Sequence, residues 1–172
     1  MEKLAIAIFN ADWSHTNAQY TDPNLVVSPD NSRNAFTSLI NVAHKTLAIE
    51  AEEIQDSQIE QDLVNAAQHG VQVQVILPAP SGSSSESAGG DSNSQGISTI
   101  KQAGVQVKED PQLYMHAKII IVDGQKAFVG SENISSASLD HNRELGLIVS
   151  DQNVLNTLQQ TFQQDWGISQ AA

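Results

Sequence analysis

Two hydrophobic periods alternate along the first half of the chain. Residues 36–43 and 59–67 carry apolar side chains at helical spacing, which predicts two helices that each bury one face. Short apolar runs at 25–27, 46–50 and 71–77 lie before, between and after these helices. Such runs, rich in β-branched residues, are typical of strands. The order strand, helix, strand, helix, strand predicts an α/β fold in which helices cover a sheet.

The second half continues this pattern, with a last helix whose inner side is expected to carry Val154, Leu155, Leu158, Phe162 and Trp166. The predicted strands are 105–107, 115–123, 126–129 and one ending at 147–149, and the predicted helices are 96–103 and the segment after Asp151. Residues 79–95 are rich in Ser and Gly without apolar periodicity. We interpret them as a flexible surface loop rather than a lid over a site.

The N-terminal residues 1–13 are expected to form a helical piece, and the polar residues 14–24 a linker. The domain proper is therefore predicted to span residues 25–172, which is enough for one sizeable core. A short motif, Phe-x-x-Asp-Trp, occurs both at 9–13 and at 162–166. The repeat is either a coincidence or a sign of two related helices.

The charge balance limits the partners of the protein. The formal net charge is −12, with only eight Lys and Arg residues. This disfavours a nonspecific nucleic-acid groove and a strongly anionic membrane, because both need clustered cations. The sequence has no cysteine, no apolar run long enough to span a bilayer and no recognisable signal peptide. The composition suits a soluble protein, and the compartment, cytoplasmic or secreted, stays open.

The segment from His116 to Gly146 carries the candidate chemistry. In an extended strand, His116 and Lys118 point to the same face. An imidazole beside an ammonium suits a phosphoryl group, since the imidazole attacks phosphorus or donates a proton and the ammonium holds the oxygens. Ser131 and Asn133 follow Gly130 in a turn whose N–H groups, hydroxyl and amide are expected to bind an anion.

Two carboxylates of this segment and one acidic group earlier in the chain are candidates for a role in the site. We expect Glu144, on a further strand, to accept from the distal nitrogen of His116 and so fix its tautomer. Asp123 points to the opposite face of the predicted strand and is interpreted as structural. The acidic group Glu50, Glu52 and Glu53 lacks a His or Asp at ligand spacing, so we interpret it as a strand end and a solvated loop rather than a metal site.

The pattern His116-x-Lys118-x4-Asp123-x6-Gly130-Ser131-x-Asn133 resembles the HKD motif of the phospholipase D superfamily. The continuation Asn142-x-Glu144-x-Gly146 also matches, and no core residue of the motif is substituted. The resemblance covers nearly all of the chain from Leu25 onward. It implies a mixed, largely parallel β-sheet with helices on both faces.

The resemblance also implies a mechanism. In this family, two HKD motifs meet across a pseudo-twofold axis, one histidine forms a phosphohistidine and the other protonates the leaving group. Carried onto this chain, His116 is the nucleophile or the general acid. Lys118, Ser131 and Asn133 bind the substrate, and Glu144 orients His116 or its symmetry mate. No metal or other cofactor is expected.

Only one such motif is present, because no other histidine is followed by lysine two positions later. Either two chains pair as a homodimer, or the chain is one half of a two-module protein. In the second case, residues 1–24 would hold the tail of a first module, and the repeated Phe-x-x-Asp-Trp favours this origin. A face left without its sister module would expose an apolar patch.

Three functions are compatible with these observations. The first is a phosphodiester hydrolase or transphosphatidylase acting on phospholipids. The second is a metal-independent nuclease of the same superfamily, which the acidic charge disfavours. The third is a catalytically silent half-domain that needs a partner module, which the intact motif disfavours.

Overall fold

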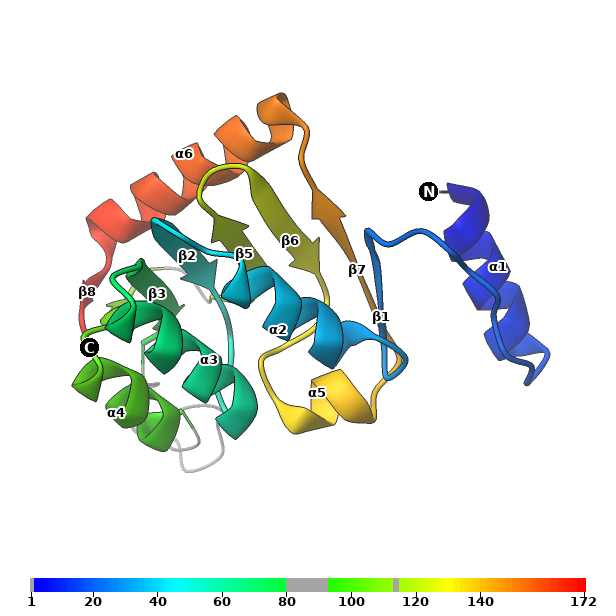
Figure 1. The fold of residues 1–172 in the computed structure, drawn as a ribbon, viewed down its shortest axis with the longest axis horizontal. Coiled ribbons are helices and arrows are strands. Elements are labelled where there is room, and N and C mark those ends of the chain that lie inside the picture. Colours follow the sequence, from blue (N-terminus) through cyan, green and yellow to red (C-terminus); the bar gives the residue numbers. More distant parts are fainter. Residues whose placement is uncertain (1, 80–92, 113–114) are drawn as a thin grey trace.

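The computed structural model describes residues 2–79, 93–112 and 115–172. Most of the segment that we interpret as a surface loop lies outside these residues. The described strands form one eight-stranded sheet in the order β1-β7-β6-β5-β2-β3-β4-β8 (Figure 1). Its strands are β1 (Leu25–Ser28), β2 (Thr46–Glu50), β3 (Gln72–Pro78), β4 (Gln106–Asp110), β5 (Ile119–Val122), β6 (Lys126–Gly130), β7 (Glu144–Val149) and β8 (Gln170–Ala171).

The prediction of a mixed α/β sheet is confirmed, but the sheet is not largely parallel. Among the described strands, only the pairs β2–β3 and β3–β4 are parallel. The pairs β1–β7, β7–β6, β6–β5, β5–β2 and β4–β8 are antiparallel. The connection explains the difference, because a parallel pair needs a crossover such as the helix between β2 and β3, whereas the tight turn at Asp123 and Gly124 reverses the chain between β5 and β6.

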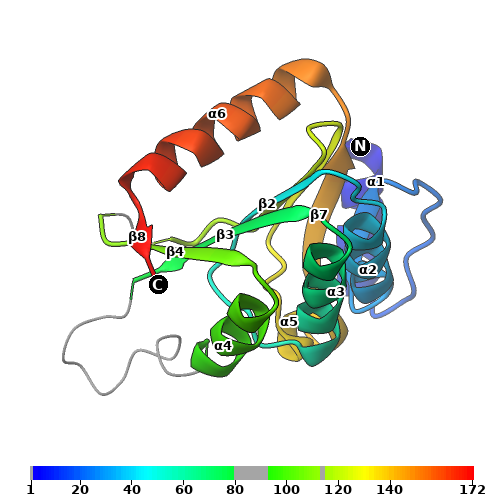
Figure 2. The ribbon, with the colours of Figure 1, turned by 60° about the vertical axis from the view of Figure 1, so that its left-hand side comes forward.

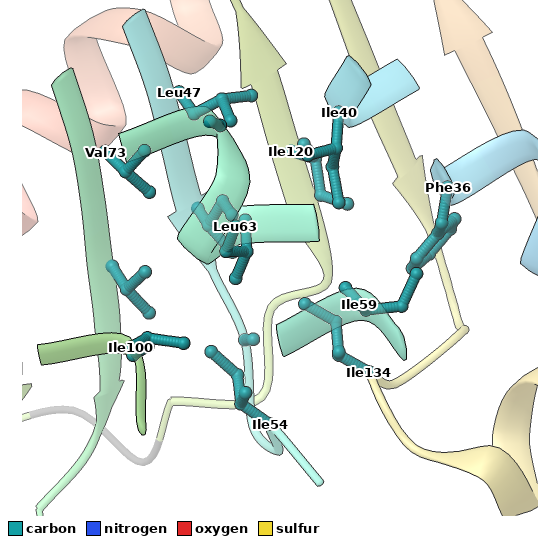
Figure 3. Close-up of a cluster of buried hydrophobic side chains, with 14 of the residues drawn as sticks. Phe36, Ile40, Leu47, Ile54, Ile59, Leu63, Val73, Ile100, Ile120 and Ile134 are labelled. Carbon is teal, nitrogen blue, oxygen red and sulfur yellow. The ribbon is translucent and has the colours of Figure 1, made fainter. Parts of the chain in front are cut away.

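Helices cover both faces of the sheet, as expected. One face carries α2 (Ser32–Asn41), α3 (Ser57–Gln68), α4 (Ser94–Gln102) and the short α5 (Ser136–Asp140), and the other carries the long α6 (Gln152–Ile168) (Figure 2). The main core lies under α2 and α3, where Ile40, Leu63 and Ile120 are among the buried residues (Figure 3). None of the helices within the described residues combines the length and apolar character needed to cross a bilayer.

The two helices that carry the Phe-x-x-Asp-Trp repeat have similar aromatic pairs but different environments. In α6, Phe162 stacks on Trp166 with ring centroids 5.8 Å apart, and in α1 (Glu2–Trp13) Phe9 stacks on Trp13 at 6.3 Å. Phe162 is only 1% exposed, whereas Phe9 is 64% exposed. Helix α1 instead contacts β1 through Ile8. The origin of α1 as the tail of another module therefore stays a prediction.

Two acidic caps fix the starts of helices, and one local expectation needs correction. The N-cap of α3 is Asp56, whose carboxylate accepts from the N–H groups of Gln58 and Ile59. Val154, expected on the inner side of α6, is exposed. Asp151 caps α6, since its side chain accepts from the N–H groups of Asn153 and Val154 at the start of the helix.

Candidate active site

His116 and Lys118 lie in the extended segment that leads into β5, rather than within the strand. We predicted a strand over 115–123, but β5 begins at Ile119. The reason is the length of its neighbour, because β2 ends at Glu50, which is paired with Ile119. The two motif residues therefore lie just past the end of β2, where both side chains approach the same carboxylate, that of Glu52.

Lys118 is the buried residue of the site. Its side chain is only 6% exposed, and its Nζ lies 2.8 Å from Oε2 of Glu52. The same ammonium donates to the backbone oxygen of His116 at 2.9 Å. A buried ammonium is tolerated only when it is paired with an anion and hydrogen-bonded, and both conditions are met here.

Two further nitrogen atoms lie close to the same oxygen of Glu52. Nε2 of His116 lies 3.1 Å from Oε2, and Nδ2 of Asn133 donates to Oε2 at 3.3 Å. The His116 side chain is 65% exposed, so it is the member of the group that a ligand can reach from solvent. The structure thus brings His116, Lys118 and Asn133 together around one point, as the motif predicts.

Glu52 is the residue that the sequence interpretation missed. Burial opposes its ionisation, but the hydrogen bond and charge of Lys118 outweigh this effect and lower the pKa of the carboxyl. The solvated-loop interpretation of Glu52 is therefore wrong. The signal that would have found it is the antiparallel pairing of β2 with β5, which brings the residues after Glu50 next to those before Ile119.

The turn after Gly130 differs from the expected anion-binding turn. The N–H of Ser131 donates to the backbone oxygen of Leu145 at 3.1 Å, and the N–H of Asn133 donates to Oγ of Ser138 at 2.8 Å. No helix starts until Ser136. These N–H groups are therefore engaged within the protein, and the prediction of exposed amides is wrong for them.

Ser131 and Glu144 form a second polar group beside the first. The hydroxyl of Ser131 donates to Oε2 of Glu144 at 2.5 Å and accepts from the N–H of Leu145 at 3.2 Å. Glu144 also accepts from Oγ of Ser138 at 3.3 Å. The orientation of His116 by Glu144 and the binding of substrate by Ser131 stay predictions.

Between these groups, Glu132 is a buried acid. One of its oxygens accepts from the N–H of Ser131 at 3.1 Å, and the other has no hydrogen-bond partner within the described structure. Burial, together with the charge of Glu144, raises the pKa of Glu132 to about 7, against the opposing effect of its backbone hydrogen bonds. The motif thus contains a carboxyl group that changes charge near neutral pH.

Asp123 lies at the opposite end of β5 from His116 and is bound to backbone. Its carboxylate accepts from the N–H groups of His44, Lys45 and Thr46 at 2.8–2.9 Å. Burial opposes ionisation, but these hydrogen bonds lower the pKa of Asp123. These contacts fix the start of β2 against the β5–β6 turn, which supports the structural interpretation of this motif residue.

No group of three His, Asp or Glu side chains within the described ranges has the arrangement of a metal site. The site itself supplies hydrogen-bond donors, an imidazole and carboxylates. Nitrogen atoms of three side chains around one oxygen suit the binding of an oxyanion. One of the three, the exposed imidazole, can also act as a nucleophile or a proton donor.

Comparison with known proteins identifies the family of this chain and several relatives. Residues 36–166 match the family described as "Cardiolipin synthase, PLD-like domain". A mitochondrial cardiolipin hydrolase of Canis lupus familiaris is 35% identical over 75 residues, which are 43% of this chain and 30% of that protein. The "Probable cardiolipin synthase YwiE" of Bacillus subtilis is 27% identical over 131 residues, 76% of this chain and 26% of that protein. This chain therefore spans less than a third of the length of either relative.

The fold has a counterpart among solved structures. The phospholipase D family member Nuc of Salmonella typhimurium aligns with a TM-score of 0.74 and 21% identity, over 86% of this chain and 95% of that one. The family match at residues 36–166 includes Glu52, His116, Lys118 and Asn133 and extends over most of the sheet. The chain thus belongs to the phospholipase D superfamily, through a PLD-like domain of the cardiolipin synthase family.

Proposed function

We propose that this chain is a phosphodiesterase that uses His116 in a two-step transfer of a phosphoryl group. The observation that carries this proposal is the convergence of Nε2 of His116, Nζ of Lys118 and Nδ2 of Asn133 on one oxygen, at 3.1, 2.8 and 3.3 Å. A phosphodiester presents an anionic oxygen of the same kind. In that complex, Lys118 and Asn133 hold the nonbridging oxygens, and their N–H groups stabilise the negative charge on these oxygens in the transition state.

The first step forms a bond between the imidazole nitrogen of His116 and phosphorus, and breaks the bond between phosphorus and the leaving alcohol. The leaving alkoxide takes a proton from a second histidine. In the second step, that histidine removes a proton from water or an alcohol, whose oxygen attacks phosphorus and releases His116. Hydrolysis and transfer differ only in which hydroxyl enters.

A second HKD module must supply the other histidine. The described part of the chain brings one His-x-Lys pair to the site, so we infer that another copy of the chain or a sister half completes it. Two exposed apolar residues support this inference, because Val129 precedes Gly130 on β6 and Leu145 follows Glu144 on β7. An apolar patch beside a half-site is the surface expected to be covered by a partner.

Phospholipid is the substrate class that we favour. Two protein relatives are described as a cardiolipin hydrolase and a probable cardiolipin synthase. The net charge of −12 weighs against nucleic acid as the substrate, because a polyanion needs clustered cations on its binding surface. The motif itself recognises the phosphodiester and not the groups attached to it.

The test is hydrolysis of bis(p-nitrophenyl) phosphate with EDTA present, for the wild type, His116→Ala and His69→Ala. His69 follows α3, just before β3 starts at the end of the sheet that lies away from the site. Its variant therefore controls for the loss of a surface imidazole. We expect EDTA-resistant turnover in the wild type and in His69→Ala, and none in His116→Ala. Equal turnover in all three would refute the role of His116.

Substrate class is tested with the same variants on vesicles that contain cardiolipin and on single-stranded DNA. Release of phosphatidic acid from the vesicles that depends on His116 supports the phospholipid proposal. Cleavage of DNA, with vesicles left intact, would instead assign the nuclease function. Sedimentation equilibrium on the active sample shows whether two chains have paired.

A further inference from the structure

The carboxylate of Glu52 stands where the proposed function needs a phosphoryl oxygen. Lys118 and Asn133, the two donors assigned to the substrate oxygens, already bind Oε2 of this side chain, and Nε2 of His116 lies 3.1 Å from it. We propose that Glu52 is an internal anion that occupies the phosphoryl-oxygen position of the empty site, and that a substrate oxygen displaces it. This inference rests on the proposed use of Lys118 and Asn133 as phosphate ligands and of His116 as the nucleophile.

The burial of Lys118 makes this an exchange of one anion for another. The Lys118 side chain is 6% exposed and that of Glu52 is 20% exposed. A buried ammonium that loses its counter-ion without replacement is strongly unfavourable. Glu52 therefore leaves Lys118 only when another oxyanion takes its place, and an empty site without either anion is not stable.

The backbone around Glu52 is fixed, so the exchange needs only a rotation of the side chain. Nδ2 of Asn93 donates to the backbone oxygen of Glu52 at 3.0 Å, and its Oδ1 accepts from the N–H of Ile54 at 3.0 Å. The next N–H, that of Gln55, donates to the oxygen of Ile134 at 2.8 Å. Glu52 itself lies after the end of β2, where no strand partner restricts its side chain.

The exchange has consequences for His116. In the resting site, Nε2 of His116 lies 3.1 Å from the carboxylate, so this nitrogen is engaged by Glu52 rather than open to an electrophile. Entry of a phosphodiester removes that contact, and the nitrogen attacks phosphorus once its proton has passed to the Glu52 carboxylate. Glu52 thus acts as a specificity-determining residue, because an anion binds only if it competes with a tethered carboxylate for Lys118 and Asn133.

The experiment measures the binding of inorganic phosphate by isothermal titration to the wild type, Glu52→Gln and Glu53→Gln. Glutamine keeps the shape of the side chain but removes the competing charge. We expect Glu52→Gln to bind phosphate about tenfold more tightly or better, since a unit charge within 4 Å in a partly buried site is worth at least that factor. Glu53→Gln removes the same charge one residue away, and we expect it to bind phosphate like the wild type.

Two further variants keep the result interpretable. Lys118→Met should abolish the phosphate binding of both the wild type and the Glu52→Gln background, which locates the ion in this site. If Glu52→Gln does not fold, as judged by circular dichroism, Glu52→Asp serves instead, because a side chain shorter by one methylene reaches Lys118 less well and should also bind phosphate more tightly.

Unchanged or weaker phosphate binding in Glu52→Gln, or in Glu52→Asp where that variant replaces it, overturns the inference. An equal gain in Glu53→Gln also overturns it, because the effect would then come from overall charge. The measurement needs no turnover, so it is independent of the hydrolysis assay. Tighter phosphate binding without any diesterase activity would support the role of Glu52 and refute the proposed function.

Discussion

Gly146 on β7 lies directly against the ring of Phe128 on β6. A Cβ atom at Gly146 would stand 2.7 Å from Cζ of Phe128 and 2.9 Å from Oε2 of Glu132, closer than real side chains approach. Phe128 cannot withdraw, because it is buried and packs edge-on against Phe36 with ring centroids 4.6 Å apart. The absence of a side chain at Gly146 therefore allows β7 to approach β6 and to bring Glu144 next to Ser131.

We expect Gly146→Ala to lower the free energy of unfolding by about 1–3 kcal/mol, the usual cost of inserting a methyl group into a packed core. Gly167→Ala is the matched control, since nothing lies within 4 Å of its Cβ position in α6. Because alanine favours helix over glycine, this control should gain up to about 1 kcal/mol. Urea unfolding of both variants measures the difference, and equal stabilities would contradict the proposed clash.

The candidate site was predictable only in part, and the missing part has a physical cause. The spacing from His116 to Asn133 lies within one stretch of chain, so the sequence alone identified these residues. Glu52 is 64 residues before His116, and nothing in its own segment shows that β2 pairs with β5. A contact that depends on strand pairing between distant segments cannot be predicted from the local sequence pattern.

The fold shows the same limit. The helical periods predicted α2, α3 and α6, because amphipathic spacing is a local property. The orientation of β5, β6 and β7 is not local in this sense, and the assumption of a largely parallel sheet failed there. The residues Asp123 and Gly124, both with positive φ, were the available signal, because a left-handed pair between two apolar runs is typical of a tight hairpin.

The pair formed by Lys118 and Glu52 should show energetic coupling. Lys118→Met leaves the Glu52 carboxylate without its cation, and we expect a loss of about 2 kcal/mol in the free energy of unfolding. In the double variant Lys118→Met with Glu52→Gln, the unpaired charge is gone, so most of that loss should be recovered. A double-mutant cycle by chemical denaturation measures the coupling. Strictly additive effects would show that the two groups do not interact in solution.

Glu50 should make the stability of the protein depend on pH. Burial, and then the negative charges of Asp165 and Asp110, raises the pKa of Glu50 from 4.5 to about 7. Between these pH values, the folded chain keeps a proton that the unfolded chain has released. The free energy of unfolding therefore falls as the pH rises from 4.5 to about 7, by about 3 kcal/mol for this group.

The variant Glu50→Gln tests this dependence, because glutamine cannot ionise. We expect it to be more stable than the wild type at pH 8, and the advantage to disappear by pH 5. Glu53→Gln is the matched control for the loss of a nearby carboxylate and should follow the wild type. Thermal unfolding at pH 5, 6, 7 and 8 gives the comparison, and a constant offset between Glu50→Gln and the wild type would rule out the titration of Glu50.

Glu132 should influence catalysis in the same range of pH. Its pKa of about 7 means that it becomes charged as the pH rises above neutrality, next to Ser131 and the charge of Glu144. A new negative charge there opposes the binding of an anionic substrate. We expect the turnover of the wild type to decline above pH 7, and Glu132→Gln to show a weaker decline. Identical pH profiles for the two proteins would exclude this contribution.

The last prediction concerns the surface that the proposed partner module covers. Leu145 is exposed beside Glu144, and an acidic residue there would place an unpaired charge in an apolar contact. We therefore expect Leu145→Glu to remove both self-association and diesterase activity while the chain stays folded. Val154→Glu, at an equally exposed apolar position on α6, is the control and should retain both. Sedimentation velocity, circular dichroism and the hydrolysis assay together decide the matter. An active monomeric Leu145→Glu variant would refute the need for a second HKD module, because a single chain would then carry out the whole reaction.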